Sequence, residues 1–449
     1  MESRDDPAGR APAVAGVPLS ALALLLVLAG LLSAAGPASA FLGWFGRGEG
    51  TPKLPEQVTT EQDWLASHVG GRNLVVVDAR PVEQYRHGHI PTAISIDPDE
   101  LPGLPDLPAA LAGLGLSGSS RIVCYGADSY SSRAAKLFWM LELAGAGRAS
   151  VLDGGLSAWR ESGRNVATER AVLPGTTWRV RPRPELLADA SYVEARYGEE
   201  GFEIVDARGS EAWARSLLEG EGVGRVGHIP HSLPFDFRTL LGAGGSFLPV
   251  EATHEILAEL GPRPSTFVDL ADEFIVYGDG LTGEGALGYF LMRRAGVEKV
   301  VFYPGGWAEW AADPELPVVR IIAAEELMDR LDRERRLLRP DRPPTEFVLF
   351  DVRHFSAYDG GRGHIPGAVS LSSSQFADSL EIFLERHWPG IDRGAAPIVT
   401  YCYGEHCIRS RHTSTLAARA GFLRVERFFG GLSEWRGVGG EVAHSPADE

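Results

Sequence analysis

The feature that most constrains the fold of this chain is a sequence pattern that occurs three times along its 449 residues. Each copy opens with an apolar run ending in Asp-x-Arg, continues to a Gly-His-Ile-Pro turn, adds a second apolar run and closes with Gly-Gly-x-x-x-Trp. Internal repetition of this kind indicates one structural unit present in several copies. The arginines of the first motif are Arg80, Arg208 and Arg353, and the closing tryptophans are Trp159, Trp310 and Trp435.

Within each copy, short apolar runs typical of strands alternate with amphipathic stretches typical of helices. Strands that are separated by helices pair in parallel through crossover connections. The sequence therefore predicts three α/β domains, each with a central parallel sheet flanked by helices. We expect domain 1 at residues 56–170, domain 2 at 180–318 and domain 3 at 319–440. A composition of 44% hydrophobic and 23% charged residues is ordinary for globular domains.

The N-terminal segment has the pattern of an export signal. Residues 17–36 form an apolar run long enough to span a bilayer, which takes about 20 residues. The Ala-Ser-Ala sequence at 38–40 fits the small-residue rule for signal-peptide cleavage. We expect residues 1–40 to be a signal peptide, or alternatively an uncleaved anchor, and residues 41–55 to be a flexible linker. In both cases the three domains are expected to be exported, either periplasmic or secreted.

Charge and cysteine content exclude several classes of function. With 43 Lys and Arg against 60 Asp and Glu, the net charge of -17 repels a phosphate backbone, so nucleic acid is not an expected partner. Three cysteines are too few for a disulfide framework. No His, Cys or carboxylate recurs at metal-ligand spacing, so we expect no metal and no cofactor. We expect the motif histidines to bond loop backbone, Asp-x-Arg to act as an ion pair or loop clamp, and the tryptophans to pack in the cores.

The chemistry is expected where the second apolar run of each copy ends, because ligands of parallel sheets bind at the carboxyl ends of strands. When the copies are aligned on their Gly-Gly pairs, this position holds Tyr125, Gly278 and Cys402 in turn. Only the cysteine is a strong nucleophile. A thiol in a tight loop before a helix lies near backbone N–H groups and the positive end of the helix dipole, which favour its thiolate. Three nearby cationic candidates would favour the thiolate further, namely His406, Arg409 and Arg411.

These motifs, repeated in the same order, resemble the rhodanese (sulfurtransferase) family, and the resemblance covers residues 56–437 as three tandem rhodanese-like domains. In that family a cysteine at the strand end attacks a sulfane sulfur, forms a persulfide and passes the outer sulfur to a thiophilic acceptor. The resemblance implies that Cys402 is this catalytic cysteine and that domains 1 and 2, which lack it, are inactive. It also implies a persulfide and anion cradle made by the backbone amides of Tyr403, Gly404, Glu405, His406, Cys407 and Ile408.

The two other cysteines are interpreted separately. Cys407 completes a Cys-x4-Cys loop that resembles a subset of bacterial rhodanese-like proteins. Cys407 is either a resolving thiol, which forms a disulfide with Cys402 or takes its persulfide sulfur, or a small buried residue at the helix start. Cys124 lies one residue before the strand-end position assigned to domain 1, so strand alternation predicts a buried, inert thiol.

The predicted function is the transfer of a sulfane sulfur from a donor such as thiosulfate or mercaptopyruvate to a thiol or cyanide acceptor, through a persulfide on Cys402. Loops specialised for thiosulfate usually carry basic side chains directly after the cysteine, whereas Tyr403, Gly404 and Glu405 follow it here. This departure from the family pattern speaks against thiosulfate as the physiological donor.

Two other classes of function are alternatives to sulfur transfer. A cysteine phosphatase needs Cys-x5-Arg, but position 408 is Ile and Arg409 comes one place late. A non-enzymatic scaffold, binding protein or redox and sulfide sensor is the stronger alternative, because two of the three strand ends lack a nucleophile. Tandem domains often share their active site with a neighbour, so segment 278–283 of domain 2 is expected to border the Cys402 loop. Membrane contact is expected only through the N-terminal segment, if that segment is uncleaved.

Overall fold

The structure, a computed structural model of the whole chain, describes the three domains but not the N-terminal segment. The expected signal peptide at 1–40 and linker at 41–55 lie outside the described residues. Among the described residues, no helix combines the length and apolar character that a membrane crossing needs. The described residues are 58–214, 225–242, 245–257, 273–280, 283–337, 347–359, 362–405 and 407–444.

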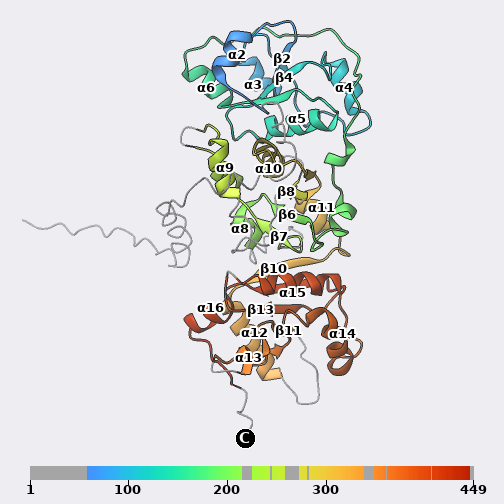
Figure 1. Cartoon of the computed structure of the whole chain (residues 1–449), viewed down its shortest axis with the longest axis vertical. Coiled ribbons are helices and arrows are strands. Elements are labelled where there is room, and N and C mark those ends of the chain that lie inside the picture. Colours follow the sequence, from blue (N-terminus) through green and yellow to red (C-terminus); the bar gives the residue numbers. More distant parts are fainter. Residues whose placement is uncertain are drawn as a thin grey trace, which may run out of the picture. The chain divides into compact units, whose positions relative to one another are not determined.

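Domain 1, which is coloured blue to teal in Figure 1, is built on a five-stranded, all-parallel sheet in the order β1-β5-β4-β2-β3. Its central strand β4 is an apolar run buried along nearly its whole length, as expected for a parallel strand covered on both faces. The strands are β1 (Thr59–Thr60), β2 (Leu74–Asp78), β3 (Ile94–Ser95), β4 (Arg121–Tyr125) and β5 (Ala149–Leu152). The helices are α2 (Gln62–His68), α3 (Val82–Arg86), α4 (Leu107–Gly113), α5 (Ser132–Leu143) and α6 (Gly155–Glu161).

Domain 2 has a four-stranded, all-parallel sheet in the order β7-β6-β8-β9. A single parallel bridge between Leu187 and Phe302 stands where domain 1 has its edge strand β1. The strands are β6 (Phe202–Asp206), β7 (Ser232–Pro234), β8 (Glu273–Tyr277) and β9 (Val300–Tyr303). The helices are α7 (Ala190–Glu194), α8 (Gly209–Ala214), α9 (Val250–Leu257), α10 (Glu284–Arg294) and α11 (Gly306–Ala312), with short 3-10 turns at Pro184–Leu186 and Phe237–Leu240.

Domain 3 repeats the strand order of domain 1, as β10-β14-β13-β11-β12, again with parallel pairing throughout. The predicted α/β class, with a central parallel sheet in each domain, is therefore confirmed. The strands are β10 (Val318–Ile322), β11 (Val348–Asp351), β12 (Val369–Ser370), β13 (Ile398–Tyr401) and β14 (Arg424–Phe428). The helices are α12 (Ala324–Leu337), α13 (Phe355–Asp359), α14 (Phe376–His387), α15 (Ile408–Arg419) and α16 (Gly431–Gly437).

The Asp-x-Arg motif forms a buried clamp at the carboxyl end of the sheet. In domain 3, Arg353 donates to the two carboxylate oxygens of Asp351 at 2.8 and 2.5 Å, and to the carbonyl of Gly363 at 2.7 Å. The Tyr401 hydroxyl donates to Asp351 at 2.7 Å and accepts from the N–H of Ile365 at 3.0 Å. The predicted ion pair and loop clamp is therefore confirmed. The corresponding residues are Asp78, Arg80 and Tyr125 in domain 1, and Asp206, Arg208 and Tyr277 in domain 2.

The histidines and tryptophans of the repeated motifs have structural roles, as predicted. Nδ1 of His89 lies 3.0 Å from the carbonyl oxygen of Tyr85, and the two rings stack at 3.8 Å. The indole N–H of Trp435, a core residue, donates to the carbonyl of Glu441 at 2.7 Å. Equivalent bonds are made by His228 and His364, and by Trp159 and Trp310.

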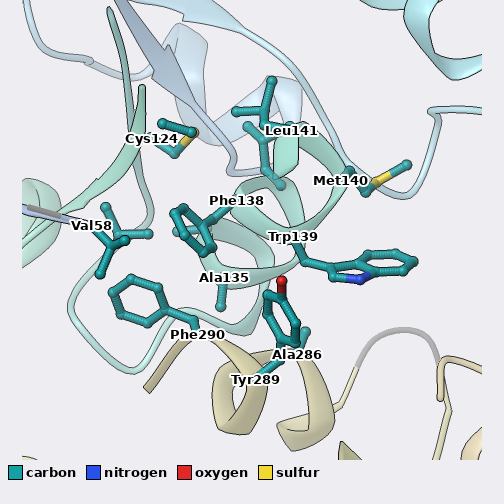
Figure 2. Packing of buried hydrophobic residues seen from close by; sticks show 14 of the residues in the cluster. Val58, Cys124, Ala135, Phe138, Trp139, Met140, Leu141, Ala286, Tyr289 and Phe290 are labelled. Atoms are coloured by element: carbon teal, nitrogen blue, oxygen red, sulfur yellow. The ribbon is translucent and has the colours of Figure 1, made fainter. Parts of the chain in front are cut away.

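Domains 1 and 2 share one hydrophobic core, because α5 and α10, the helices that follow the two degenerate loops, pack on each other (Figure 2). Phe138 and Phe290 meet edge to face at 5.2 Å, and Trp139 meets Phe302 in the same way at 5.0 Å. The Tyr289 hydroxyl donates to the buried carboxylate of Glu142 at 2.9 Å. The two domains without a nucleophile therefore form a joint structural body.

Domains 2 and 3 are joined through the Gly-His-Ile-Pro turn of domain 2. His228 and Val319 exchange two backbone hydrogen bonds, at 2.9 and 3.0 Å, across the domain boundary. The His228 ring stacks on Trp213 at 4.2 Å, and Trp213 in turn contacts Phe429 of domain 3 at 5.9 Å. Burial lowers the pKa of His228 well below its ordinary range, and the nearby Arg427 lowers it further. His228 is therefore neutral at the domain boundary.

We predict that acid weakens the boundary between domains 2 and 3. The unfolded chain protonates His228 below about pH 6.5, whereas the folded chain does not, so unfolding takes up a proton in this range. The stabilisation is complete above about pH 6.5 and is lost progressively as the pH falls below it. Urea unfolding midpoints measured across this range should fall less steeply in His228→Gln than in the wild type. A variant of the exposed His387, His387→Gln, is the matched control, and equal slopes for all three proteins contradict the prediction.

Candidate active site

Cys402 directly follows β13, at the carboxyl end of a central strand of domain 3, and the loop after it leads into α15. Two backbone bonds fix the start of this loop on α16, from Leu432 N–H to Cys402 O and from Ser433 N–H to Tyr403 O, both at 3.0 Å. Gly431 allows the start of α16 to lie this close to the loop. Its φ is +55°, and a Cβ at this position would lie 2.4 Å from the Cys402 carbonyl oxygen. The strand end therefore holds Cys402 where the sequence predicts the chemistry.

The alignment on Gly-Gly pairs was wrong by one residue in domain 1. Tyr125, Tyr277 and Tyr401 make the same hydrogen bond to the clamp aspartate, so these tyrosines are equivalent. The counterparts of Cys402 are therefore Gly126 and Gly278, whose carbonyls accept the same bond from the following Gly-Gly helix. The segment from the strand end to the Gly-Gly pair is as long in domain 1 (Gly126 to Gly154) as in domain 3 (Cys402 to Gly430), so the error was to take Tyr125 rather than the residue after it as the strand-end position.

Cys124 consequently lies two residues before the strand-end position, Gly126, rather than one. Its side chain is fully buried in the joint core of domains 1 and 2, and burial raises the pKa of its thiol. The predicted buried thiol is confirmed.

The loops of domains 1 and 2 have no room for a nucleophile. A Cβ on Gly126 would lie 1.9 Å from Oγ of Ser131, the residue that occupies the position of Cys407. A Cβ on Gly278 would lie 2.7 Å from the backbone nitrogen of Gly285, because the start of α10 closes on the loop. Both strand ends lack a thiol and also lack the space for one.

We predict that Gly126→Cys creates no second active site. In a Cys402→Ser background, the added side chain would overlap Ser131, which should destabilise domain 1 by about 1–3 kcal/mol and leave sulfur transfer undetectable. Gly113→Cys is the matched control for stability, since a Cβ at Gly113 meets no atom within 4 Å. Turnover assays and unfolding of both variants provide the measurement, and sulfur transfer by Gly126→Cys would contradict this account of the degenerate loop.

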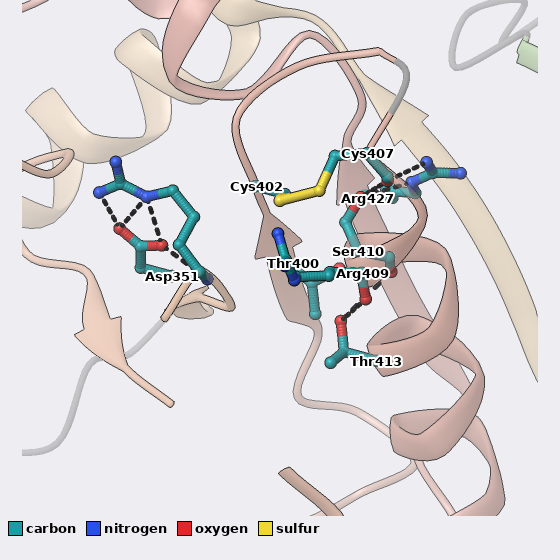
Figure 3. The surroundings of a disulfide bond; sticks show 9 residues. Asp351, Thr400, Cys402, Cys407, Arg409, Ser410, Thr413 and Arg427 are labelled. Carbon is teal, nitrogen blue, oxygen red and sulfur yellow. Dashed lines mark hydrogen bonds and ion pairs between the residues drawn. A yellow bond between two sulfur atoms is a disulfide. The ribbon is translucent and has the colours of Figure 1, made fainter. Parts of the chain in front are cut away.

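Cys402 and Cys407 form a disulfide, with their Cα atoms 6.2 Å apart (Figure 3). Cys402 is 1% exposed, whereas Cys407 is partly exposed and is the N-cap residue of α15. The N–H of Cys407 donates to the Gly404 carbonyl at 3.0 Å, so in this oxidised loop it is not directed at the sulfur of Cys402. The amide cradle over 403–408 stays a prediction for the reduced loop, and His406 lies outside the described residues.

The predicted cationic residues occupy different surroundings. Arg409 is exposed, whereas Arg411 is buried at the first turn of α15. The guanidinium of Arg411 donates to Glu203 of domain 2 at 2.8 Å and to the carbonyl of His231. The charge of Arg411 is therefore shared with a carboxylate from the neighbouring domain rather than held for the loop alone.

The polar contacts between domain 2 and α15 come from Tyr197, Glu199, Glu203 and His231, and none of the described residues of the predicted segment 278–283 takes part. Within that segment, Asp279 faces Arg208 of its own domain at 3.7 Å, and residues 281–282 lie outside the described residues. Domain 2 does border the active-site helix, as expected, but through β6 and the residues around it.

Sequence reasoning missed Arg427, a buried guanidinium beside the loop. Arg427 lies on β14, donates to Ser410 Oγ at 2.9 Å and to the Cys407 carbonyl at 3.3 Å, and makes no ion pair with any described carboxylate (Figure 3). Burial lowers the pKa of Arg427, and repulsion by Arg411 lowers it further. The available signal was a charged pair, Glu426 and Arg427, between the apolar residues Val425 and Phe428 of β14. Arg427 adds an uncompensated positive charge next to the Cys-x4-Cys loop.

Among the described residues, no group of three or more His, Cys, Asp or Glu side chains is placed to hold a metal ion. The described groups of the site are the two sulfurs, the amides of the loop and the guanidinium groups around it.

Comparison with known proteins places this arrangement in a family. A probable 3-mercaptopyruvate sulfurtransferase of Pseudomonas aeruginosa is 32% identical over 289 residues, which cover 58% of this chain and 97% of the relative. A thiosulfate sulfurtransferase of the same organism is 25% identical over 265 residues, covering 57% of this chain and 94% of the relative. Among solved structures, an anaerobic ergothioneine biosynthesis enzyme from Chlorobium limicola matches in fold, with a TM-score of 0.51 and 20% identity over 58% of this chain and 69% of that chain.

The family model for the rhodanese-like domain matches the chain three times, at residues 61–162, 189–313 and 323–437. These matches cover more than half of the chain and coincide with the three parallel sheets. The resemblance drawn from the motifs is confirmed, and the chain belongs to the rhodanese family as a protein of three tandem rhodanese-like domains.

Proposed function

We propose that this protein is a sulfurtransferase in which domain 3 performs the chemistry and Cys402 carries the sulfur as a persulfide. The observation that carries the proposal is the placement of Cys402 at the carboxyl end of β13, at the strand-end position where domains 1 and 2 hold only glycine. Relatives named as mercaptopyruvate and thiosulfate sulfurtransferases support the same class of reaction.

The proposed reaction has two steps. The Cys402 thiolate attacks the sulfane sulfur of the donor, which forms the S–S bond of the persulfide and releases sulfite from thiosulfate or, after protonation, pyruvate from mercaptopyruvate. A thiolate or cyanide then attacks the outer sulfur, which regenerates the Cys402 thiolate. The N-terminal end of α15 and the uncompensated charge of Arg427 favour the anionic sulfur in both steps.

The disulfide between Cys402 and Cys407 represents a resting state in this proposal, because a disulfide sulfur is not a nucleophile. Transfer therefore requires prior reduction of the loop. The exported location expected from residues 17–36 belongs to the same proposal, since disulfides persist in oxidising compartments.

The donor is proposed to be a small anion, either thiosulfate or mercaptopyruvate. Tyr403 directly follows the nucleophile, and its ring lies under the guanidinium groups of Arg353 at 5.3 Å and Arg362 at 5.5 Å. Because the charge of Arg353 is neutralised by Asp351, Arg362 supplies the positive charge next to the loop, from outside the residues directly after Cys402. This compensates locally for the net charge of -17, which would repel an anionic donor.

The test uses the reduced full chain, each donor in turn, and cyanide or a thiol as acceptor. We expect repeated turnover with at least one donor and, without an acceptor, one additional sulfur atom on Cys402 by mass spectrometry. If neither a persulfide nor turnover is found with either donor, the proposal fails. A persulfide that forms but does not turn over would instead favour the sensor function, which the joint core of the two degenerate domains also fits.

A further inference from the structure

The two sulfurs of the active-site disulfide differ in accessibility. Cys402 is 1% exposed and is a member of the hydrophobic core that domains 2 and 3 share. Cys407 only packs against the edge of that core and is partly exposed, at the point where the loop enters α15. Of the two residues, Cys407 is therefore the one that a molecule in solution can contact.

Thiol–disulfide exchange depends on which sulfur an incoming thiolate can reach. We propose that this loop has a second activity, thiol–disulfide exchange with a dithiol reductant, in which the reductant attacks Cys407 and Cys402 is the leaving group. This assigns to Cys407 the role of the attacked sulfur, beyond that of a thiol that resolves a persulfide.

The exchange balances in two steps. In the first, a reductant thiolate forms an S–S bond to Cys407, the Cys402–Cys407 bond breaks, and Cys402 leaves as a thiolate. In the second, the other thiolate of the reductant attacks its own sulfur in the mixed disulfide, and Cys407 leaves as a thiolate. The reductant is oxidised to a disulfide, and the two electrons reduce the pair in the loop.

The charges around Cys407 favour the approach of the reductant and the second step. Cys407 caps the 12-residue helix α15, so the positive end of the helix dipole lies at the attacked residue. The guanidinium of Arg427 donates to the Cys407 carbonyl at 3.3 Å and makes no ion pair with any carboxylate in the described part of the chain. Both charges attract an incoming thiolate, and both stabilise the Cys407 thiolate that leaves in the second step.

The order of attack also has a consequence for the neighbouring site. Cys402 is released in the first step, while Cys407 is still bonded to the reductant. The buried thiolate is therefore freed before the exposed one, and it cannot re-form the disulfide without displacing the reductant. Domain 3 thus combines a partly exposed cysteine that the reductant attacks with a buried cysteine that is released as the nucleophile.

The experiment compares the two sulfurs directly. The variants Cys402→Ser and Cys407→Ser, each in a Cys124→Ala background, retain a single cysteine that is converted to a mixed disulfide with thionitrobenzoate. Glutathione is then added, and the rate of thionitrobenzoate release is followed by absorbance. We expect release from Cys407 to be at least about tenfold faster than release from Cys402, because access limits exchange.

A second measurement uses the wild-type chain in its disulfide form. Brief treatment with glutathione, acid quenching, alkylation and peptide mass mapping should place glutathione on Cys407 and the alkyl group on Cys402. Equal release rates in the variants, or glutathione on Cys402, would overturn the inference. Neither measurement uses a sulfur donor, so a failure here leaves the proposed sulfur transfer untouched, and the reverse also holds.

Discussion

The Cys402→Ser variant is expected to lose sulfur transfer, with kcat lowered at least about a thousandfold, because removal of a covalent nucleophile abolishes its intermediate. A serine hydroxyl forms no persulfide, and the strand ends of domains 1 and 2 offer no thiol that takes over. Steady-state turnover with thiosulfate and with mercaptopyruvate, measured on the reduced full chain, tests this expectation.

Two cysteine variants are the matched controls for Cys402→Ser. Cys124→Ala removes a thiol that is fully buried in the core of domains 1 and 2, and its turnover should equal that of the wild type. Cys407→Ser removes the disulfide and should still form a persulfide on Cys402 under reducing conditions. Turnover by Cys402→Ser at the wild-type rate would remove Cys402 from the mechanism, whatever the controls show.

The Asp351→Ala variant is expected to lower the free energy of unfolding of domain 3 by about 3–5 kcal/mol, the usual effect of leaving a buried charge without its partner. Arg353 and Asp351 are both fully buried and 2.5 Å apart, and Tyr401 donates to the same carboxylate. Removal of the carboxylate leaves the guanidinium and the hydroxyl without their acceptor. Hydrogen exchange of the β11 and β13 amides reports on domain 3 alone and suits a chain of three domains.

Two further variants distinguish the loss of a buried partner from a general effect of removing charge. Glu381→Ala breaks a more exposed ion pair with Arg393 in the same domain, whose side chains are 50% and 35% exposed, and should change the unfolding free energy by less than about 1 kcal/mol. The double variant Asp351→Ala/Arg353→Met removes both charges and should recover part of the loss. An Asp351→Ala effect as small as that of Glu381→Ala would show that the clamp does not stabilise the fold.

Much of the fold was readable from the sequence because its determinants are local or recur in order. Apolar runs alternate with amphipathic stretches, and this periodicity predicts parallel strands joined by helices. The clamp residues Asp351, Arg353 and Tyr401 occur at fixed places in every copy, so their common role was visible from the repetition. The position of Cys402 at a strand end followed from the same repetition.

The parts of the site that the sequence did not reveal depend on contacts between distant residues. Arg411 pairs with Glu203, which lies 208 positions earlier in the chain and in another domain. In the sequence, Arg427 is one of several charged residues in a short strand. Its burial beside Cys407 results from the packing of the domain. The equivalence of Gly126 with Cys402 was missed although both lie equally far from their Gly-Gly pairs, and it emerged from the hydrogen bonds of the strand-end tyrosines.

From the sequence alone, it was possible to predict three α/β repeats and a nucleophilic cysteine at the strand end of the third. These properties follow from periodicity and from motifs whose partners lie within one domain. The burial of Cys402, the partial exposure of its disulfide partner Cys407 and the charge of Arg427 beside them are visible only in the tertiary structure. Accessibility and desolvation are set by every element that packs around a residue, and the order of the residues along the chain does not specify that packing locally.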